Sequence, residues 1–493
     1  MTDALTVPEV RRLGPARLTA GMDRWDRLDL AAHRRTHGPL PGLDRAELLA
    51  LADRVDLRGR GGAGFPFARK ARAALAAAGR SGRAPVLVVN GTEGEPPSVK
   101  DATLLARAPH LVLDGVALAA AAFNAVEVVI AVASGSAAEV SVPAAIDERL
   151  PPLSMPAPTR TLCLPERFVS GESSAVIRAV NGEAALPLTR PARAAEGGPG
   201  GVAGRPTLLS NAETWAQLAL AARLGPDGYA VVGTPDEPGT LLVTMNRAPS
   251  QPLVVEVPAG ASLGVLLDAC GVDPGAGVLV GGYHGAWLAP DTATRTPLSR
   301  AGLSAAGGAL GAASIVTMPN RACALAEVTA VAAWLAAESA GQCGPCRRGL
   351  PETAEALRDL TRGIGSADAV RRAAAIGRGR GACAHPDGVA RFVLTALTVF
   401  AQEVAAHEST GSCGRPQTSA TLPLPHPAGE RLAVDWARCS GHGLCASLAP
   451  DLIALDAHGF PVFRDEGPLA PWQRHQADRA VAQCPALALR LGG

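Results

Sequence analysis

The C-terminal part of the chain carries a cysteine spacing that is typical of iron–sulfur ligands. Cys439 and Cys445 flank His442, and Cys484 follows later, directly before a proline. Soft thiolate sulfur suits iron, and a tight turn can present several thiolates to one cluster. The spacing therefore predicts a compact unit over 429–493 in which Cys439, Cys445 and Cys484 hold a cluster.

The order of elements around these cysteines resembles the small single-cluster ferredoxins common in actinobacteria. A helix start at Ala449, a hairpin across 456–459 and a helix over about 470–482 suit their α+β ferredoxin-like fold. Their usual middle cysteine is His442 here. Three thiolates favour [3Fe-4S] over [4Fe-4S], but a His-ligated [4Fe-4S] cluster, a zinc site and a plain surface histidine all stay open.

A second cysteine group lies in a helix-rich stretch. Cys343 and Cys346 form a Cys-Gly-Pro-Cys motif, and Cys383 follows later. Three thiolates can hold a three-iron cluster, or a four-iron cluster with a foreign fourth ligand. The candidates for that ligand are His385, Cys413 and a small molecule. A zinc site and a degenerate, empty site are the alternatives.

Bulk properties narrow the class of protein. A chain of 493 residues is too long for one hydrophobic core, and the net charge of +1, with no basic stripe, argues against nucleic acid as a partner. Ten cysteines without a signal peptide suit metal ligation in a reducing cytoplasm. The longest apolar tract, Leu111–Ala133, is interrupted by Asp114, Asn124 and Glu127, so we expect no membrane span.

Hydrophobic periodicity predicts a multidomain α/β protein. Residues 1–45 form a polar, aperiodic N-terminal arm, and 46–236 alternate strand and helix, as in a Rossmann-like α/β domain with a largely parallel sheet. Residues 237–315 form a small α+β module, 316–412 a small helical bundle and 413–428 a linker. In the α/β domain the predicted strands are 85–90, 126–132 and 160–164, and the predicted helices are 70–78, 104–123 and 173–180.

A glycine-rich loop precedes the first of these strands. Gly59, Gly61 and Gly64 match the dinucleotide fingerprint in spelling, but a helix precedes them and no acidic ribose-binding residue follows at the usual distance. A Rossmann NAD site at this loop is therefore disfavoured. Glycines still let backbone N–H groups approach a phosphate or a flat ring, although a purely structural turn is the alternative.

An acidic loop follows the strand over 85–90. It contains Asn90, Glu93 and Glu95, and open α/β sheets bind ligands at the carboxyl ends of their strands. Its carboxylates can accept hydrogen bonds from ribityl or ribose hydroxyls. The alternative is a solvated surface loop.

Together these segments resemble the NADH-binding flavoprotein subunit of respiratory complex I (the bacterial F subunit) and its relatives in NAD-reducing hydrogenases and formate dehydrogenases. The likeness covers roughly 50–415, and its matching pieces are Arg58–Pro66, Asn90–Pro96 with Lys100 and Asp101, Ser170–Glu172, Ser210–Thr214 and Glu338–Arg347. The resemblance implies FMN on the α/β domain, an SLBB-like β-grasp module over 237–315 and an iron–sulfur cluster, [4Fe-4S] or [3Fe-4S], in the helical bundle.

The resemblance also implies roles for single residues. Phe65 would lie at the nicotinamide stack and Glu95 near the nicotinamide, as the catalytic pair. The residues that would bind FMN are Gly59, Gly61, Gly64, Lys70, Asn90, Glu93 and Asn211. The first of the family's four cluster cysteines is Ala340 here, which leaves Cys343, Cys346 and Cys383 and keeps the cluster type open.

Several departures from the family fall on nicotinamide contacts. One stacking aromatic is replaced by Ala73, a second falls near Arg193, and a ribose-binding glutamate is Ser173. An aspartate of the acidic loop is Thr92. Each aromatic contact contributes about 1 kcal/mol, so NADH should bind more weakly than in the family. Arg193, with Arg190, would instead offer positive charge to a 2′-phosphate.

The sequence therefore predicts a flavin/iron–sulfur oxidoreductase, similar to the F subunit of NADH dehydrogenase and fused to its own ferredoxin. Electrons would pass between a nicotinamide or other donor, FMN, the helical-domain cluster and the ferredoxin. The alternative is an electron-transfer or docking subunit of a larger or membrane reductase, without its own NAD(P)H site; a zinc-bearing scaffold is a weaker third. We expect a redox partner or membrane reductase, and a cytoplasmic location or attachment to a membrane through that partner.

Three further cysteines have no partner spacing. Cys163, Cys270 and Cys323 lie in apolar runs. Free cysteine in such runs usually packs as a small hydrophobic residue. We expect all three to be small buried residues.

Overall fold

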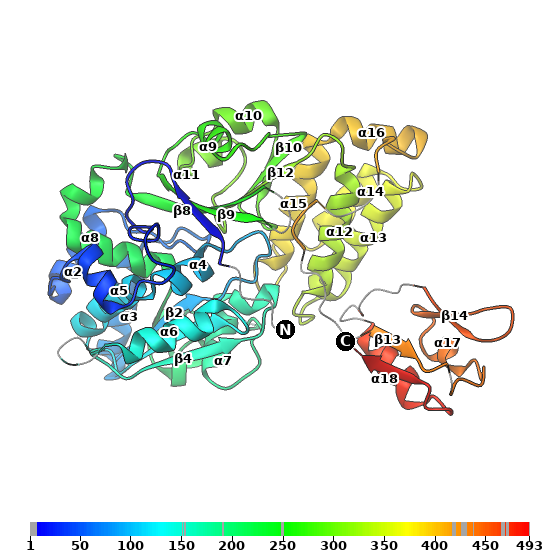
Figure 1. Cartoon of the computed structure of the whole chain (residues 1–493), viewed down its shortest axis with the longest axis horizontal. Helices are drawn as coiled ribbons and strands as arrows, with labels where there is room; N and C mark the ends of the chain where they lie inside the picture. The colour runs from blue at the N-terminus through cyan, green and yellow to red at the C-terminus, as the bar shows by residue number, and fades with distance from the viewer. Residues whose placement is uncertain are drawn as a thin grey trace. The chain divides into compact units, whose positions relative to one another are not determined.

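A four-stranded parallel sheet lies at the centre of the α/β domain (Figure 1). Its strand order is β4-β3-β2-β5, and all three neighbouring pairs run parallel. The strands are β2 (Val86–Gly91), β3 (Glu127–Ala133), β4 (Thr159–Leu164) and β5 (Thr207–Asn211). The predicted strands and the parallel sheet are confirmed.

The structure is a computed structural model, and it divides into two units after Pro423. The described residues are 7–149, 151, 154–189, 192–247, 251–416, 421–424, 431–436, 438–464, 469 and 473–492. Arg190 and part of the predicted linker lie outside them. Thr421 and Leu422 belong to the first unit, where their backbone N–H groups donate to Glu327.

Side chains of the sheet alternate between two hydrophobic cores. Leu87 and Val89 face one core, whereas Val86 and Val88 face the other. This period of two is the geometry of a strand buried on both faces. The first core also holds α2 (Arg45–Arg54), α3 (Phe67–Ser81), α5 (Pro109–Phe123) and α8 (Ala212–Ala230), and the second holds α7 (Ser173–Val180).

The helix predicted over 104–123 is wrong as a single element. The structure has α4 (Lys100–Arg107) and α5, bent by 91° at Ala108. Pro109 opens α5, and proline has no N–H and disfavours a helical conformation in the residue before it. α6 (Ala137–Asp147) packs against α4 and β4.

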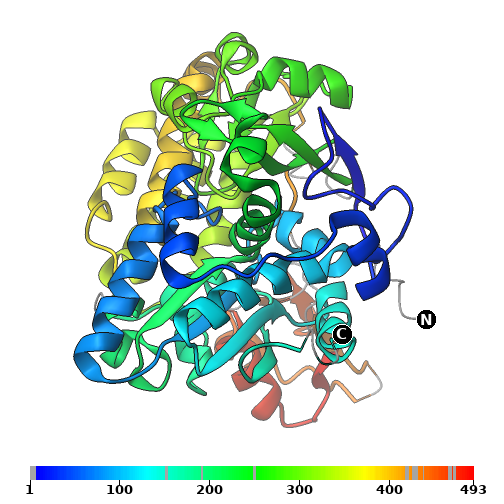
Figure 2. The same ribbon diagram turned by 90° about the vertical axis from the view of Figure 1, so that its left-hand side faces the viewer.

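A six-stranded mixed sheet forms the second part of this unit. Its order is β1-β9-β8-β12-β10-β11. The strands are β1 (Glu9–Arg12), β8 (Thr240–Asn246), β9 (Pro252–Pro258), β10 (Gly277–Val280), β11 (Ala286–Leu288) and β12 (Ser314–Met318), and α9 (Leu263–Cys270) packs in the same core. Figure 2 shows β1, in dark blue, beside the green strands.

The stretch predicted as an aperiodic arm is therefore structured in part. β1 pairs in parallel with β9, and α1 (Leu30–His37) brings His33 within 2.7 Å of Asp114 on α5. Both side chains are buried. The strand and the helix in this stretch are too short for their apolar residues to show a clear repeat. They form because they pair and pack against distant parts of the chain.

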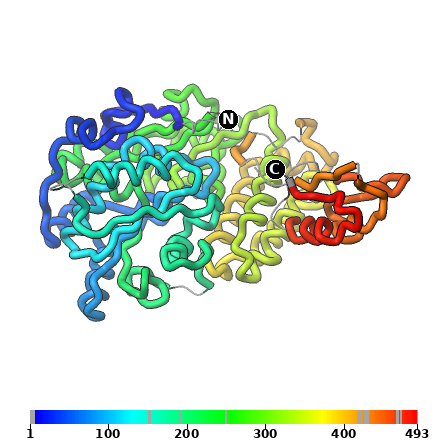
Figure 3. The backbone as a smooth tube through the Cα atoms, turned by 60° about the horizontal axis from the view of Figure 1, so that its bottom comes forward, coloured from blue at the N-terminus to red at the C-terminus, as the bar shows by residue number. Residues whose placement is uncertain are grey.

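A helical domain completes the first unit (Figure 3, yellow to orange). It consists of α12 (Ala324–Ala337), α13 (Leu350–Thr361), α14 (Ala367–Ile376), α15 (His385–Val399) and α16 (Ala401–Thr410), with a π-helical turn at Pro345–Gly349. No single helix in the described residues is long and apolar enough to cross a membrane, and the two pairs that would reach that length, α4 with α5 and α15 with α16, are sharply bent.

The second unit is a small α+β fold. β13 (Arg431–Val434) pairs with β16 (Leu489–Gly492), and β14 (Ile453–Leu455) pairs with β15 (Pro461–Phe463) across the predicted hairpin. The helices are α17 (Leu444–Leu448) and α18 (Arg474–Ala482). The predicted helix start at Ala449 is wrong: α17 begins just before Cys445, and Ala449 ends it.

Candidate functional site

A cavity of about 230 Å³ opens at the carboxyl ends of β2 and β5. These two strands are neighbours at the point where the strand order reverses, because β3 and β4 lie on the other side of β2. Open α/β sheets bind ligands at such a point. Asn90, Glu93, Glu95, Gly61 and Asn211, all predicted from the sequence, line the cavity.

The glycine loop brings its backbone against β5. Gly62 and Gly64 have positive φ angles of 104° and 60°, which favour glycine, and the Gly59 N–H donates to Phe65 O at 3.0 Å. A Cβ atom on Gly61 would lie 3.4 Å from Cβ of Asn211. Gly61 therefore faces the cavity, whereas Gly59 and Gly64 shape the turn.

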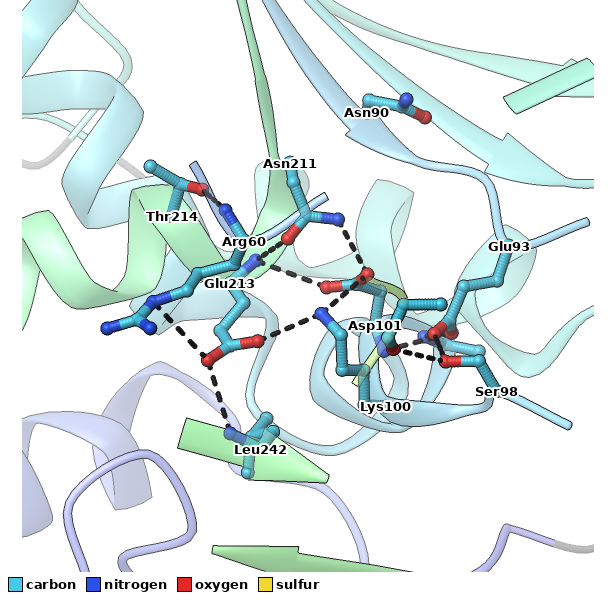
Figure 4. Close-up of polar contacts among 12 residues, drawn as sticks. Arg60, Asn90, Glu93, Ser98, Lys100, Asp101, Asn211, Glu213, Thr214 and Leu242 are labelled. Carbon is cyan, nitrogen blue, oxygen red and sulfur yellow. Dashed lines mark hydrogen bonds and ion pairs between the residues drawn. The ribbon is translucent and has the colours of Figure 1, made fainter. Parts of the chain in front are cut away.

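A buried ion network supports Asn211 from below (Figure 4). Lys100 Nζ lies 2.8 Å from Glu213 and 3.1 Å from Asp101, and Asn211 Nδ2 donates to Asp101 at 2.6 Å. Burial would lower the pKa of Lys100, but Asp101 and Glu213 raise it overall, so the ammonium stays charged. The network holds the Asn211 amide in one orientation.

Lys100, Asp101 and Glu213 were not predicted as site residues. They stand inside segments that the family resemblance matches, so the signal was present in the sequence. Their roles depend on a contact between α4 and α8, whose sequences are far apart.

Glu93 accepts three hydrogen bonds from residues of the loop and the start of α4. Its Oε1 accepts from Ser98 Oγ at 2.6 Å, and its Oε2 accepts from the backbone N–H groups of Asp101 and Ala102, each at 2.9 Å. Removal from water, followed by the charge of Asp101, raises the pKa of Glu93 to about 7. Its bonds fasten the acidic loop to the start of α4.

Asn90 ties the same loop to the segment ahead of α7. Its Nδ2 donates to Gly171 O at 2.9 Å, and its Oδ1 accepts from Thr92 N at 3.2 Å. A Cβ atom on Gly94 would lie 2.3 Å from Arg167 O, so only glycine fits this approach. The cavity wall is thus built from two loops in direct backbone contact.

Glu95 lies in the cavity wall against the six-stranded sheet. Its Oε1 accepts from Tyr283 N at 2.5 Å. Removal from bulk water raises the pKa of Glu95 to about 8, so the carboxyl group carries a proton near neutral pH. A protonated carboxyl group can donate a hydrogen bond to a ligand as well as accept one.

Two buried polar atoms of residues that line the cavity form no hydrogen bond within the described part of the chain. Thr92 Oγ1 and Arg60 Nε are buried without a hydrogen bond to the described residues, and Arg60 Nε is 4.0 Å from Glu213 in an ion pair. A buried polar atom without a partner costs free energy, so a polar ligand would be stabilised here. The unbonded polar atoms suit the hydroxyl or phosphate groups of a ligand. The backbone of the glycine loop at Gly61, which has no side chain in the way, suits a flat ring.

A second pocket, of about 410 Å³, adjoins Lys70. Its lining includes Phe65, Arg69, Ala73, Ser173 and Arg193. Three positions where the chain departs from the family therefore share one pocket. The Arg69 guanidinium carbon lies 5.5 Å from the centre of the Phe65 ring, which is 41% exposed.

Lys70 points its ammonium group to β5. Its Nζ donates to Leu209 O at 3.0 Å, and burial lowers its pKa. Within the described part of the chain, Lys70 forms no ion pair with an acidic side chain. A phosphate or an electron-rich ring edge would supply the missing negative charge.

Three cysteines of the helical domain converge. Cys343 Sγ and Cys346 Sγ are 3.5 Å apart, and Cys383 is close enough to both for their charges to interact. Burial would raise the pKa of Cys343, but N–H groups of Ala382 and Cys346 lower it overall. Such N–H groups stabilise thiolate sulfur, the form that binds iron.

Neither protein candidate for a fourth ligand completes this group. Both ring nitrogens of His385 are engaged, Nδ1 with His284 Nε2 and Nε2 with Leu335 O, each at 2.9 Å. Cys413 lies beside Cys323, at the start of α12, whereas Cys343 follows the end of α12. A helix of this length spans roughly 20 Å, too far for one cluster.

The three cysteines of the second unit also gather. Burial, with the neighbouring Cys484 and Cys439, raises the pKa of Cys445. Burial would raise the pKa of Cys484, but backbone N–H groups following it lower the value overall, with Ala488 N at 3.3 Å from Sγ. His442 is exposed.

Two of the three cysteines without partner spacing are buried as predicted, and one is not. Cys270 is buried as expected, but Cys163 is exposed, so its prediction is wrong. β4 is the edge strand of its sheet, which leaves one side of Cys163 open. Cys323 is buried but contacts Glu403 and His407.

Comparisons with known protein families divide the chain into the same domains. Family models match as the Nuo51 FMN-binding domain over residues 52–220, the NADH-ubiquinone oxidoreductase-F iron-sulfur binding region over 326–414 and a 4Fe-4S single cluster domain over 432–491. These matches confirm the FMN domain, two iron–sulfur domains and the resemblance seen in the sequence.

Similar proteins cover most of the chain. The F subunit of NADH-quinone oxidoreductase from Streptomyces coelicolor is 27% identical over 82% of this chain and 95% of its own length. NADP-reducing hydrogenase subunit HndC of Solidesulfovibrio fructosivorans is 27% identical over 82% of this chain and 83% of its own.

A solved structure shares the fold. The NAD+-reducing [NiFe]-hydrogenase in its H2-reduced state matches with a TM-score of 0.69 and 26% identity, over 82% of this chain and 68% of that chain. The matched domains, the relatives and the shared fold agree. The chain is therefore an FMN and iron–sulfur electron-transfer oxidoreductase, related to the F subunit of NADH-quinone oxidoreductase and extended by a 4Fe-4S single cluster domain.

Proposed function

We propose that this oxidoreductase takes electrons from a nicotinamide nucleotide at FMN and passes them one at a time to a helical-domain cluster. The proposal rests on one observation: a candidate cluster cysteine and the candidate FMN-binding residues line the same cavity. Cys383, Ala384 and His385 line the cavity that Asn90 and Asn211 also line. A cluster on Cys383 would then be next to a ligand in that cavity, as electron transfer requires.

The residues of the cavity would divide the binding of FMN between them. Gly61 and Asn211 would contact it from the glycine loop and β5, and Asn90 from β2, while Lys70, which lines the second pocket, would supply positive charge. Gly59, Gly64 and Glu93 would shape and fasten the loops. When bound, FMN supplies the conversion between two-electron and one-electron transfer.

The nicotinamide nucleotide would enter the pocket beside Lys70. Phe65 offers the remaining aromatic face there, and protonated Glu95 would lie near the nicotinamide. Ala73 and Ser173 supply neither a stacking ring nor a carboxylate, so affinity for NADH would be low. Arg193 would meet a 2′-phosphate if the nucleotide is NADPH.

Cys343, Cys346 and Cys383 would hold the first cluster and Cys439, Cys445 and Cys484 the second. Three protein thiolates at each site favour [3Fe-4S] or a [4Fe-4S] cluster with another fourth ligand. The second cluster would relay electrons to or from a redox protein or membrane reductase. We also assign the six-stranded sheet as an SLBB-like β-grasp module and the second unit as ferredoxin-like.

A second candidate function follows from Ala73 and Ser173. If the pocket beside Lys70 binds no nucleotide, the chain is an electron-transfer or docking subunit that receives electrons from a partner. The exposed Phe65 ring would then be part of a contact surface.

One anaerobic titration tests the proposal and separates the two functions. The full chain is purified with flavin, iron and sulfide counts, and its flavin absorbance and EPR spectra are recorded after NADH, NADPH and dithionite. Bleaching of the flavin by either nucleotide, followed by cluster signals, supports the proposal. Reduction by dithionite alone selects the second function, and absence of flavin and iron rejects both.

A further inference from the structure

Four metal-binding side chains meet at the end of the helical domain away from Cys343. Cys323 immediately precedes α12, Glu403 and His407 are one turn apart on α16, and Cys413 follows the glycine that ends α16. One donor atom from each lies within 4.8 Å of the other three. We infer that these side chains bind a zinc ion, at a site separate from both iron–sulfur cysteine groups.

The imidazole of His407 is oriented for a metal. Its Nδ1 lies 2.8 Å from Thr361 O, and a carbonyl oxygen only accepts, so Nδ1 carries the hydrogen. Nε2 therefore presents a lone pair, and it lies 3.5 Å from Cys323 Sγ. A metal-bound histidine typically donates its other N–H to a carbonyl or carboxylate in this way.

The carboxylate of Glu403 is held from the opposite side. Its Oε2 accepts from Arg415 at 2.5 Å, and its Oε1 accepts from Leu325 N at 2.9 Å and lies 3.3 Å from Cys323 Sγ. Outer partners of this kind fix the direction of a metal ligand. Glu403 and His407 occupy successive turns of one helix face, a spacing that two ligands of one ion can share.

The donor set and its spacing favour zinc. Two thiolates, one imidazole and one carboxylate are four ligands, the number that a structural zinc site uses. With zinc distances of about 2.0–2.3 Å, tetrahedral donors are separated by about 3.3–3.8 Å, so the observed group needs only a small contraction. Magnesium and calcium prefer oxygen ligands, and an iron–sulfur cluster held by only two cysteines takes two histidines as well, whereas this group has one histidine.

Binding would join three segments of the helical domain. The ion would connect the start of α12, the side of α16 and the residues after Gly411. Cys323, Glu403 and His407 are buried and Cys413 is half-buried, so solvent has little access. A closed site with four protein ligands contributes to folding rather than to catalysis.

The test uses the full chain, purified anaerobically from medium that contains both iron and zinc. Metal content is measured together with zinc K-edge X-ray absorption, which counts sulfur neighbours. We expect about one zinc per chain with two sulfur and two nitrogen or oxygen neighbours. Cys413→Ala should weaken zinc binding more than about tenfold and leave iron and flavin unchanged, whereas Cys270→Ser, at a buried cysteine outside this group of four, should retain the ion.

Other outcomes would overturn the inference. Wild-type protein without zinc, Cys413→Ala with undiminished zinc, or zinc with three or more sulfur neighbours would each do so, the last because zinc would then occupy iron–sulfur cysteines. If Cys413→Ala does not fold, the inference is tested instead by replacing zinc with cobalt in the wild-type protein and recording its absorption spectrum. Thiolate-to-cobalt absorption bands from a tetrahedral site support the inference, and octahedral cobalt without them overturns it.

Discussion

His284 and His385 hydrogen-bond to each other, Nε2 to Nδ1 at 2.9 Å, in the wall of the cavity that Asn90, Asn211 and Cys383 also line. Nε2 of His385 must donate to Leu335 O, so Nδ1 of His385 accepts from His284. Burial lowers the pKa of both rings, to about 4 for His385. Both rings are therefore neutral at pH 7, and their tautomers are determined by the chain.

Replacing His284 by leucine should destabilise this wall. Nδ1 of His385 would lose its donor, and a buried unsatisfied group costs about 1–3 kcal/mol. The measurement is the free energy of unfolding in urea. His284→Gln, which keeps an N–H donor, should recover part of the loss, and equal stability of His284→Leu and wild type would contradict the assigned bond.

Gly94→Ala should abolish flavin binding. Its new Cβ would lie 2.3 Å from Arg167 O, so the acidic loop and the segment before α7 must separate. The flavin-to-protein ratio after purification measures the effect. Gly79→Ala is the matched control, because Gly79 lies in α3 with nothing within 4 Å of its Cβ position; flavin retained by Gly94→Ala would show that the cavity wall is not needed.

Ala73→Phe should strengthen binding of a nicotinamide nucleotide. The new ring would face the pocket that already contains Phe65, and one aromatic contact contributes about 1 kcal/mol, or roughly a fivefold lower Kd. Stopped-flow reduction of the flavin by NADH and by NADPH gives the Kd. Ala76→Phe, on an exposed part of the same helix, should change neither value.

The contribution of Glu95 to stability should fall between pH 4.5 and about 8. Its pKa is raised from 4.5 to about 8, so the folded protein keeps a proton that the unfolded chain releases. Folding is then favoured at the acid end, and each pKa unit corresponds to roughly 1.4 kcal/mol. The Tm of the wild type relative to that of Glu95→Gln should fall from pH 5 to 8, and a difference that does not change with pH would mean that Glu95 is ionised.

Cys383→Ser and Cys484→Ser should each remove one cluster and leave the other. The two cysteines belong to separate units, each with its own group of thiols. Iron counts and EPR of the reduced protein measure the loss, and flavin content should stay unchanged in both variants. Loss of all iron from either one would mean that the clusters are not independent.

The sequence by itself determined the local features. Alternating apolar residues such as those from Val86 to Val89 specify a strand buried on two faces, whatever packs on them. The spacing of Cys343 with Cys346, and of Cys439 with Cys445, is local too, because one turn presents both thiolates. The spacing therefore predicted the iron–sulfur domains, whereas FMN was predicted from the resemblance to the F-subunit family, and the family models confirm both.

Only the tertiary structure decided which distant residues share a site. Ala73, Ser173 and Arg193 line one pocket although they lie on different elements, and Lys100 meets Glu213 between two helices. Cys323 had no partner spacing, yet packing of α12 on α16 brings it to His407. The periodicity of apolar residues does not predict such contacts, because they depend on how the helices and strands pack against each other.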